Sequence, residues 1–391
     1  MSGCRTTIKA GGGTPAEHAP ATLIIDLDKI RNNYATLQGL CAGHEVGAGR
    51  EVGAVVKADG YGLGARQVAI ALAQAGARTF FVAQLDEALT VRRALDEQVP
   101  DCRVFVLNGL VAGAAGEYRA ARLQPVLNSL GEIEDWSAFN RRRDLTLPAA
   151  VQVDTGMARL GLPDDELDAL AAAPERFDGW EMSLIMSHLA CADTPAHPLN
   201  AEQLARFRGA LARLPRAPAS LANSSGIFLG PGYLFDLARP GAALYGVNPT
   251  PAQPNPMSQV VRLQARILQV RQIDAPRSVG YGAAHRIEGP SRIATVGVGY
   301  ADGYPRSLSG RATAWIEGRE VPIVGRISMD LTTIDVSSLA TEDVGVGGLV
   351  DLICPHRGVD RLASEAGTIG YEILTSLGCR YHRVYKSGDT S

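Results

Sequence analysis

Eight short apolar runs between residues 53 and 239, separated by helix-like stretches, constrain the fold more than any other feature of this sequence. Continuous apolar strands of this length are typical of a parallel sheet that is buried on both faces. Eight strand–helix units in succession predict a (β/α)8 barrel of the TIM type, with a doubly wound open sheet as the alternative. The predicted strands are Gly53–Lys57, Thr79–Ala83, Val104–Leu107, Pro125–Leu127, Ala149–Asp154, Ser183–His188, Ser220–Asn223 and Leu234–Arg239.

Helical patterns fill the intervals between these strands. The segment Asp26–Leu40 reads as a helix that begins near Asp26 or Asp28, because aspartate favours the first turn. Further helices are predicted within the intervals at Gly64–Ala75, Asp86–Glu97 and Asn200–Leu214.

The pattern changes near residue 250, where four prolines fall within residues 249–256. Such a cluster marks a boundary. Beyond it the apolar residues alternate, and Gly and Pro turns separate the runs, which predicts a mainly antiparallel β domain. Its predicted strands are Val261–Val270, Ile293–Val298, Ala312–Ile316, Leu331–Val336 and Leu349–Ile353.

We therefore expect a barrel domain over residues 22–258 and a C-terminal β domain over residues 259–391. Residues 1–21 hold three consecutive glycines and two prolines, and they lack the apolar core of a secretory signal. We expect this segment to be a disordered tail.

The composition excludes several classes of function. Of the 391 residues, 46% are hydrophobic and 20% are charged, so a large core is possible. The net charge of −3 gives no basic footprint for nucleic acid, and no apolar run is long enough to predict a membrane span. The six cysteines are far apart and form no CxxC pair, and no HExxH motif occurs. We therefore expect no bound metal and a reduced, cytoplasmic protein.

Polar residues at the ends of the predicted strands indicate where chemistry could take place, since barrel enzymes react at the carboxyl ends of their strands. Lys57 follows a buried apolar strand directly, which is costly unless the amine is used or its pKa is lowered. It is either a Schiff-base or general-base lysine, or a lysine whose charge simply reaches solvent. Gly60, Gly62 and Gly64 leave room for a ligand beside it, and they match neither a dinucleotide fingerprint nor a phosphate loop.

Three later strand ends carry further candidates. His188 ends the sixth strand and is either a site residue or a structural histidine. Asn223 and Ser224 open a short helix after the seventh, which is either an anion site or an ordinary cap. Arg239 ends the eighth, before Pro240 and Gly241. A lysine, an anion pocket and an arginine together favour a phosphorylated carbonyl cofactor, and pyridoxal 5′-phosphate satisfies all three.

These segments resemble the alanine racemase family of fold-type III pyridoxal-phosphate enzymes from about residue 22 to the C-terminus. The resemblance depends on eight motifs in the family's order, which together are very specific. They are AVVKADGYGLG (54–64), VDTGMARLG (153–161), SHLACAD (187–193), NSSG (223–226), ARPGAALYG (238–246), VGYGAAH (279–285), VGYADGYPR (298–306) and GRISMD (325–330).

The resemblance implies a homodimer in which each active site combines the barrel of one subunit with the β domain of the other. It implies that Lys57 carries the cofactor covalently and that Arg239 faces the pyridine nitrogen beside His188. Residues implied to hold the phosphate are Tyr61, Ser224, Gly241, Ala242 and Tyr371, and Asn223 is implied to bind the cofactor. Residues implied on the substrate side are Arg159, Tyr300, Met329 and Asp330, with an entrance corridor at Asp193, Arg306, Arg326 and Ile369.

The reaction implied by the resemblance interconverts L-alanine and D-alanine, which would supply D-alanine for peptidoglycan. One base must take the α-proton from one face and a second must return a proton to the other. Lys57 would serve the face on which D-alanine presents its hydrogen, and Tyr281 of the partner subunit would serve the opposite face. Tyrosine has an ordinary pKa of about 10, so cationic neighbours such as Arg159 would have to favour its phenolate.

One position departs from the family pattern. Many members carry a carbamylated lysine two residues before the aspartate of the DTGM motif, and its negative charge orients the arginine that matches Arg159. Here the residue is Gln152, which is neutral and cannot be carbamylated. Either a bound anion such as chloride replaces that charge, or Arg159 is held by direct hydrogen bonds.

Other functions remain as alternatives to the alanine racemase. The nearest is a racemase of broader specificity with the same fold. A basic amino-acid decarboxylase of this fold type would carry a cysteine motif that this sequence lacks. A non-catalytic cofactor-binding protein would need only the barrel, and Tyr281 in the β domain argues against it. A structural protein without cofactor is the remaining class.

Overall fold

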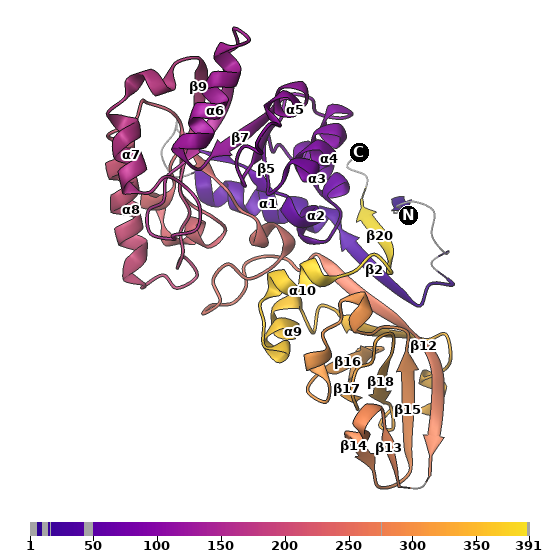
Figure 1. Cartoon of the computed structure of the whole chain (residues 1–391). Helices are drawn as coiled ribbons and strands as arrows, with labels where there is room; N and C mark the ends of the chain where they lie inside the picture. Colours follow the sequence, from indigo (N-terminus) through magenta and orange to yellow (C-terminus); the bar gives the residue numbers. More distant parts are fainter. Residues whose placement is uncertain (1–5, 10–14, 16, 43–49, 275, 389–391) are drawn as a thin grey trace. The chain divides into compact units, whose positions relative to one another are not determined.

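The computed structural model describes residues 6–9, 15, 17–42, 50–274 and 276–388 (Figure 1). Its contacts divide the chain into two units, which we describe separately. The barrel unit comprises residues 30–258, and the β unit comprises residues 1–29 together with 259–391.

The barrel unit contains a strand at each of the eight predicted positions, all paired in parallel. Seven of them form one sheet, in the order β10-β9-β8-β7-β6-β5-β4. They are β4 (Ala54–Val55), β5 (Thr79–Val82), β6 (Arg103–Val106), β7 (Leu123–Leu127), β8 (Leu147–Gln152), β9 (Trp180–Met186) and β10 (Ala219–Ser220).

Strand β11 (Leu237–Ala238) closes the sheet into a barrel. On one side it pairs in parallel with β3 (Glu51–Val52), which continues through Gly53 into β4. On the other side Arg239 N donates to Ala222 O at 2.9 Å, just beyond β10. The predicted (β/α)8 barrel is therefore confirmed, and the open-sheet alternative is wrong.

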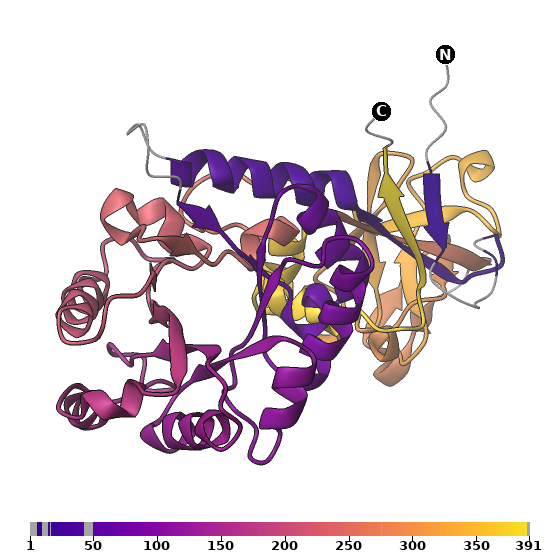
Figure 2. The same cartoon turned by 90° about the horizontal axis from the view of Figure 1, so that it is seen from above.

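Apolar side chains fill the interior of the barrel, and helices cover its outside. Val55, Phe81, Phe105, Val126 and Leu237 belong to one buried cluster drawn from five different strands. Seen from above, the purple and magenta helices lie outside the strands (Figure 2). These helices are α1 (Leu27–Ala42), α3 (Ala65–Gln74), α4 (Leu85–Asp96), α5 (Ala115–Ala120), α6 (Leu130–Arg141), α7 (Asp164–Ala171) and α8 (Pro198–Leu211). The short segment α2 (Lys57–Tyr61) is a turn directly after β4.

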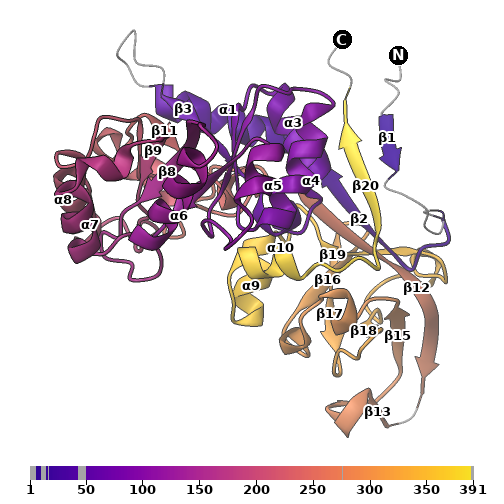
Figure 3. The ribbon, with the colours of Figure 1, turned by 45° about the horizontal axis from the view of Figure 1, so that its top comes forward.

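The β unit is built on one mainly antiparallel sheet, as predicted. Six strands form a closed circuit, because β12 pairs with both β15 and β19 (Figure 3). Its strands are β12 (Val261–Ile273), β15 (Ser291–Val296), β16 (Thr313–Ile316), β17 (Arg319–Val324), β18 (Thr332–Asp335) and β19 (Leu349–Ile353). The hairpin β13 (Arg277–Val279) and β14 (His285–Ile287), and the helices α9 (Val359–Ala366) and α10 (Gly370–Ser376), complete it.

The N-terminal segment differs from the prediction. Strand β2 (Ala21–Asp26), which we expected in the barrel domain, pairs with β12 and with β20 (His382–Ser387) of the β unit. Its alternating burial matches a sheet with one buried face, unlike the continuous burial of the barrel strands. Within the predicted disordered tail, Thr6–Lys9 forms strand β1 and pairs with β20, whereas residues 1–5, 10–14 and 16 lie outside the described residues.

Asp26 begins the first helix, as the sequence indicates. Its carboxylate accepts a hydrogen bond from the Lys29 backbone N–H at 3.0 Å, the bond expected of an N-cap.

Candidate active site

Lys57 lies at the carboxyl end of strand β4, where the chain turns in a left-handed sense. Ala58, Asp59, Gly60 and Tyr61 all have φ between 53° and 62°. The turn is closed by hydrogen bonds from Gly60 N to Val56 O (2.9 Å) and from Gly62 N to Ala58 O (2.7 Å). A left-handed conformation costs about 1–2 kcal/mol for each residue that is not glycine. Three such residues within four positions are stable only where surrounding contacts fix them.

Side-chain carboxylates supply contacts of this kind. The Asp59 carboxylate accepts from the Ala65 N–H at 2.8 Å, at the start of α3. Glu87, on α4, accepts from the Ala58 N–H at 2.6 Å. The turn that follows Lys57 is therefore fixed at both ends.

A cradle of backbone N–H groups lies beside this turn. The Ser224 hydroxyl accepts from the N–H groups of Gly241 (2.9 Å) and Ala243 (3.2 Å), so these two donors converge on one point. A Cβ at position 241 would lie 2.2 Å from the Tyr61 hydroxyl, so a larger residue there would displace the Tyr61 side chain. Tyr61 in turn stacks on Tyr245 with ring centroids 4.5 Å apart. Converging N–H groups, a serine hydroxyl and a tyrosine hydroxyl suit an anion such as phosphate.

Arg239 is a buried cation behind this cradle, only 3% exposed. Its guanidinium donates to the Ser220 hydroxyl and, at 2.5 Å, to the Ser187 carbonyl oxygen. Burial lowers the pKa of Arg239 to about 9, so it stays protonated at neutral pH. It can therefore donate a hydrogen bond to a ligand nitrogen or oxygen, and it cannot accept one.

Burial and nearby positive charges lower the pKa values of Lys57 and His188, two further titratable groups of this site. Burial, and then the charge of Arg159, lower the pKa of Lys57, whereas Glu87 raises it. Burial, Arg239, Arg159 and Lys57 together lower the pKa of His188 to about 3. His188 is therefore neutral at neutral pH, and a smaller fraction of Lys57 is protonated than of an ordinary lysine.

The low pKa of His188 predicts a loss of stability in acid. The unfolded histidine binds a proton below about pH 6.5. The folded one does so only below about pH 3. The contribution is therefore complete above pH 6.5 and is lost as the pH falls toward 3, by about 1.4 kcal/mol for each pH unit. Denaturant unfolding at pH 7 and pH 5 should show this loss in wild type and not in His188→Gln.

The control for that measurement is His18→Gln, at an exposed histidine. An equal loss of unfolding free energy in acid in wild type and in His188→Gln would contradict the low pKa of His188 as its cause.

Arg159 lies in the loop after β8 and is exposed. The Asp154 carboxylate holds this loop by accepting from the N–H groups of Gly156 and Met157, both at 2.9 Å. Gln152, at the end of β8, is buried. Among the described residues no side chain forms a hydrogen bond or ion pair with the Arg159 guanidinium, so the direct hydrogen bonds expected as one alternative are not found within the subunit.

The remaining predicted barrel residues lie near the same end of the strands. Asn223 lies just before the short helix η2 (Ser225–Leu229), and its side chain accepts from the Gly226 N–H at 2.9 Å. Ala242 is buried beside Gly241, and Asp193 is exposed in the loop after β9.

The other predicted site residues belong to the β unit, and several of them are exposed. Tyr281 is 73% exposed, Ile369 58% and Met329 54%. Tyr300 lies next to Met329, because the Tyr300 N–H donates to Ser328 O at 3.1 Å and the Ala301 N–H donates to Met329 O at 2.9 Å. Tyr371, on α10, is also exposed. The exposed large apolar residues of the β unit include Tyr281, Tyr300, Met329, Leu331, Ile369 and Tyr371.

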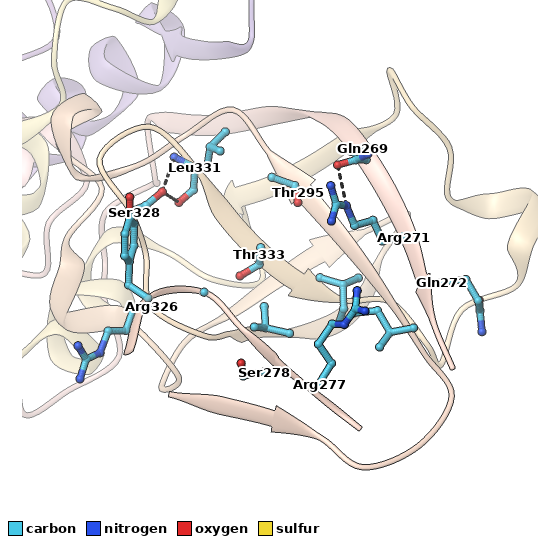
Figure 4. A pocket seen from close by; sticks show the side chains of 15 residues that line it. Gln269, Arg271, Gln272, Arg277, Ser278, Thr295, Arg326, Ser328, Leu331 and Thr333 are labelled. Atoms are coloured by element: carbon cyan, nitrogen blue, oxygen red, sulfur yellow. Dashed lines mark hydrogen bonds between the residues drawn. The ribbon is translucent and has the colours of Figure 1, made fainter. Parts of the chain in front are cut away.

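A hollow of about 890 Å³ lies beside Tyr281 and Leu331 (Figure 4). Tyr281 and Arg326 line it together with residues of β12, β15 and β18. Gly280 and Gly282 both have positive φ, and they bring the Tyr281 loop against Arg326. The loop is therefore built to present an exposed tyrosine beside an arginine.

Two acidic residues of this unit form ion pairs. Arg380 bridges Asp330 (2.8 Å) and Asp302 (2.7 Å). Asp302 is buried and accepts from the Gly299 N–H. Asp330 thus ties the Met329 loop to the C-terminal segment, the charge-partner role that aspartate often has. Arg306 is exposed on η7 (Arg306–Leu308).

Sequence reasoning missed the residues that hold the site in place. Ser187 and Ser220 position Arg239, and Glu87 holds the turn after Lys57. Ser187 precedes His188 and Ser220 begins a predicted strand, so their position offered a weak signal. Glu87 gave none, because its partner lies 29 residues away.

These residues fit pyridoxal phosphate. The amide cradle around Ser224 and Gly241 suits its phosphate, a half-buried lysine of lowered pKa suits its aldehyde, and a buried cationic donor suits its ring nitrogen. Barrel and site together define the class of lysine-dependent pyridoxal-phosphate barrel enzymes.

Comparisons with known proteins identify the family within that class. The models of the alanine racemase N-terminal and C-terminal domains match residues 25–249 and 260–385. An alanine racemase of Rhodospirillum rubrum is 53% identical, over 94% of this chain and 96% of that protein. A catabolic alanine racemase of Mesorhizobium japonicum is 49% identical, over 98% of each. The chain belongs to the alanine racemase family.

Solved structures agree with this assignment. The alanine racemase of Bartonella henselae, crystallised with covalently bound pyridoxal phosphate, is 44% identical with a TM-score of 0.88. It covers 94% of this chain, and this chain covers 99% of it. The biosynthetic alanine racemase of Pseudomonas aeruginosa is 36% identical with a TM-score of 0.84, over 94% and 100% of the two chains.

Proposed function

We propose that this chain interconverts L-alanine and D-alanine with pyridoxal phosphate attached to Lys57. The family and the cofactor of the Bartonella henselae relative support this function. The observation that carries it is the placement of Lys57, at a barrel strand end next to the Ser224–Gly241 cradle. When bound, the cofactor withdraws electrons from the α-carbon and so makes its proton acidic.

The chain's own residues then bind and move protons. Ser224, Tyr61 and the N–H groups around Gly241 would hold the phosphate, and Arg239 would donate to the ring nitrogen. Once the substrate amine has replaced it on the cofactor, the Lys57 amine would take or return a proton on one face of the α-carbon. Its lowered pKa favours the free amine that this step needs.

Tyr281 of a second subunit serves the other face. The exposed apolar residues of the β unit support a homodimer, because an interface would remove such large side chains from water. They include Tyr281, Tyr300, Met329 and Tyr371, four residues that the resemblance assigns to the site. A dimer that covers Tyr281 would bring it to the barrel of the partner.

The proposed cellular role is the supply of D-alanine in the cytoplasm. Among the described residues, no helix is both long and apolar enough to cross a membrane. Five cysteines of the described chain are free, as expected of a reducing compartment. Restored growth of a D-alanine-requiring bacterium without added D-alanine would support this role.

The experiment that tests the function uses purified protein. A visible absorbance band of bound cofactor, and D-alanine formed from L-alanine in chiral chromatography, would confirm it. L-Serine and L-lysine tested in parallel distinguish an alanine racemase from the broader racemase. An absorbance band without any racemisation would favour the cofactor-binding protein, and the absence of a band would contradict the proposal.

A further inference from the structure

Three helices of the barrel carry a glutamate at the same position, and each glutamate makes the same kind of hydrogen bond. In α4, α6 and α7 the third residue is a glutamate: Glu87, Glu132 and Glu166. Each carboxylate reaches back to a backbone N–H at the carboxyl end of a preceding strand. Glu132 accepts from Leu110 N at 3.2 Å, after β6, and Glu166 accepts from Leu130 N at 2.7 Å, after β7.

Glu87 makes this kind of hydrogen bond with the left-handed turn that follows Lys57. One of its oxygens accepts from Ala58 N at 2.6 Å, the residue directly after Lys57. The other accepts from Ala83 N at 2.7 Å and Gln84 N at 3.2 Å, at the end of β5. Glu87 therefore joins the ends of two adjacent strands, and one of them carries the lysine.

We propose that Glu87 is a positioning residue for Lys57, an inference that rests on the proposed racemase function. The bond from the Ala58 N–H fixes the first residue of the left-handed turn and hence the direction in which the Lys57 side chain leaves the strand. The negative charge of Glu87 also opposes the effect of burial on the Lys57 amine. Without the bond, Ala58 would leave its left-handed conformation, and the amine would lose its alignment.

Two substitutions of Glu87 separate the effect of its side-chain length from the effect of its charge. Glu87→Asp keeps the charge but is one methylene shorter, so it cannot span from α4 to Ala58. Glu87→Gln keeps the reach and one acceptor oxygen but loses the charge. Glu132→Asp and Glu132→Gln are the matched controls, because Glu132 has the same place in α6 and holds a loop without predicted site residues.

The test measures kcat and KM for L-alanine together with amide hydrogen exchange of the peptide containing Ala58, all on the holoenzyme. We expect Glu87→Asp to lower kcat about 10- to 100-fold. KM should change less than about threefold. Exchange at Ala58 should become faster. Glu87→Gln should recover part of kcat, and both Glu132 variants should keep kcat within about twofold of wild type.

Equal kcat in the Glu87 and Glu132 variants, or unchanged exchange at Ala58 in Glu87→Asp, would overturn the inference. Wild type that fails to racemise alanine would overturn the proposed function instead. In that case hydrogen exchange still reports whether Glu87 holds the turn.

Discussion

Replacement of Lys57 by alanine is expected to abolish racemisation and to prevent covalent attachment of the cofactor. Lys57 provides both the amine that holds pyridoxal phosphate and one of the two bases. Loss of a general base alone reduces rates by about 10²–10⁴-fold, so loss of both functions should exceed that range. The activity of Lys57→Ala should therefore be below detection in chiral chromatography.

Chemical labelling of the lysine that carries the cofactor tests the same prediction independently of kinetics. Borohydride reduction of the wild-type holoenzyme should fix the cofactor on one lysine, which peptide mapping then identifies among the four lysines of the chain. We expect Lys57, and Lys29→Ala serves as the control that keeps full activity. Cofactor found on another lysine, or normal turnover of Lys57→Ala, would contradict the site.

Replacement of Tyr281 by phenylalanine should have the second largest effect, and it should affect the two faces unequally. The variant lacks the base that serves L-alanine, so racemisation should fall by about 10²–10⁴-fold. Lys57 still serves the face of D-alanine. In deuterated water, Tyr281→Phe should therefore incorporate deuterium at the α-carbon of D-alanine and return D-alanine, while L-alanine exchanges at the reduced rate.

Nuclear magnetic resonance of both enantiomers measures this asymmetry, with Tyr233→Phe in the barrel unit as the control. Equal exchange of L- and D-alanine in Tyr281→Phe would show that Tyr281 does not serve one face alone. Undiminished racemisation would exclude it as a base.

Much of the fold could be predicted from the sequence, because barrel strands are buried on both faces and appear as continuous apolar runs. All eight predicted strand positions contain strands, from β4 after Gly53 to β11 before Arg239. Strands with mixed or polar surroundings were harder to predict. The hairpin that flanks Tyr281 and the terminal strand β20 have no clear alternation. Strand β2 was not predicted, and only its pairing with β12 and β20 shows that it belongs to the β unit.

The candidate site likewise contains some residues that could be predicted from the sequence and others that could not. Lys57, Ser224 and Arg239 follow strands directly, so their position in the sequence places them at one end of the barrel. The left-handed conformation of Ala58 and Asp59 could not be foreseen, since it depends in part on a contact with Glu87, which lies far along the chain. Nor could the residues alone assign Tyr281 to the site, because the sequence does not show how the β domain lies relative to the barrel. The family resemblance supplied that residue.

A subunit-mixing experiment tests most directly the central claim that Lys57 of one subunit and Tyr281 of its partner form one active site. Lys57→Ala and Tyr281→Phe proteins, each inactive, are dissociated together and reassociated in equal amounts. Each mixed dimer then contains one site with both bases intact. Random pairing should therefore restore about a quarter of wild-type activity. No restored activity in dimers shown by mass spectrometry to be mixed would contradict the shared site.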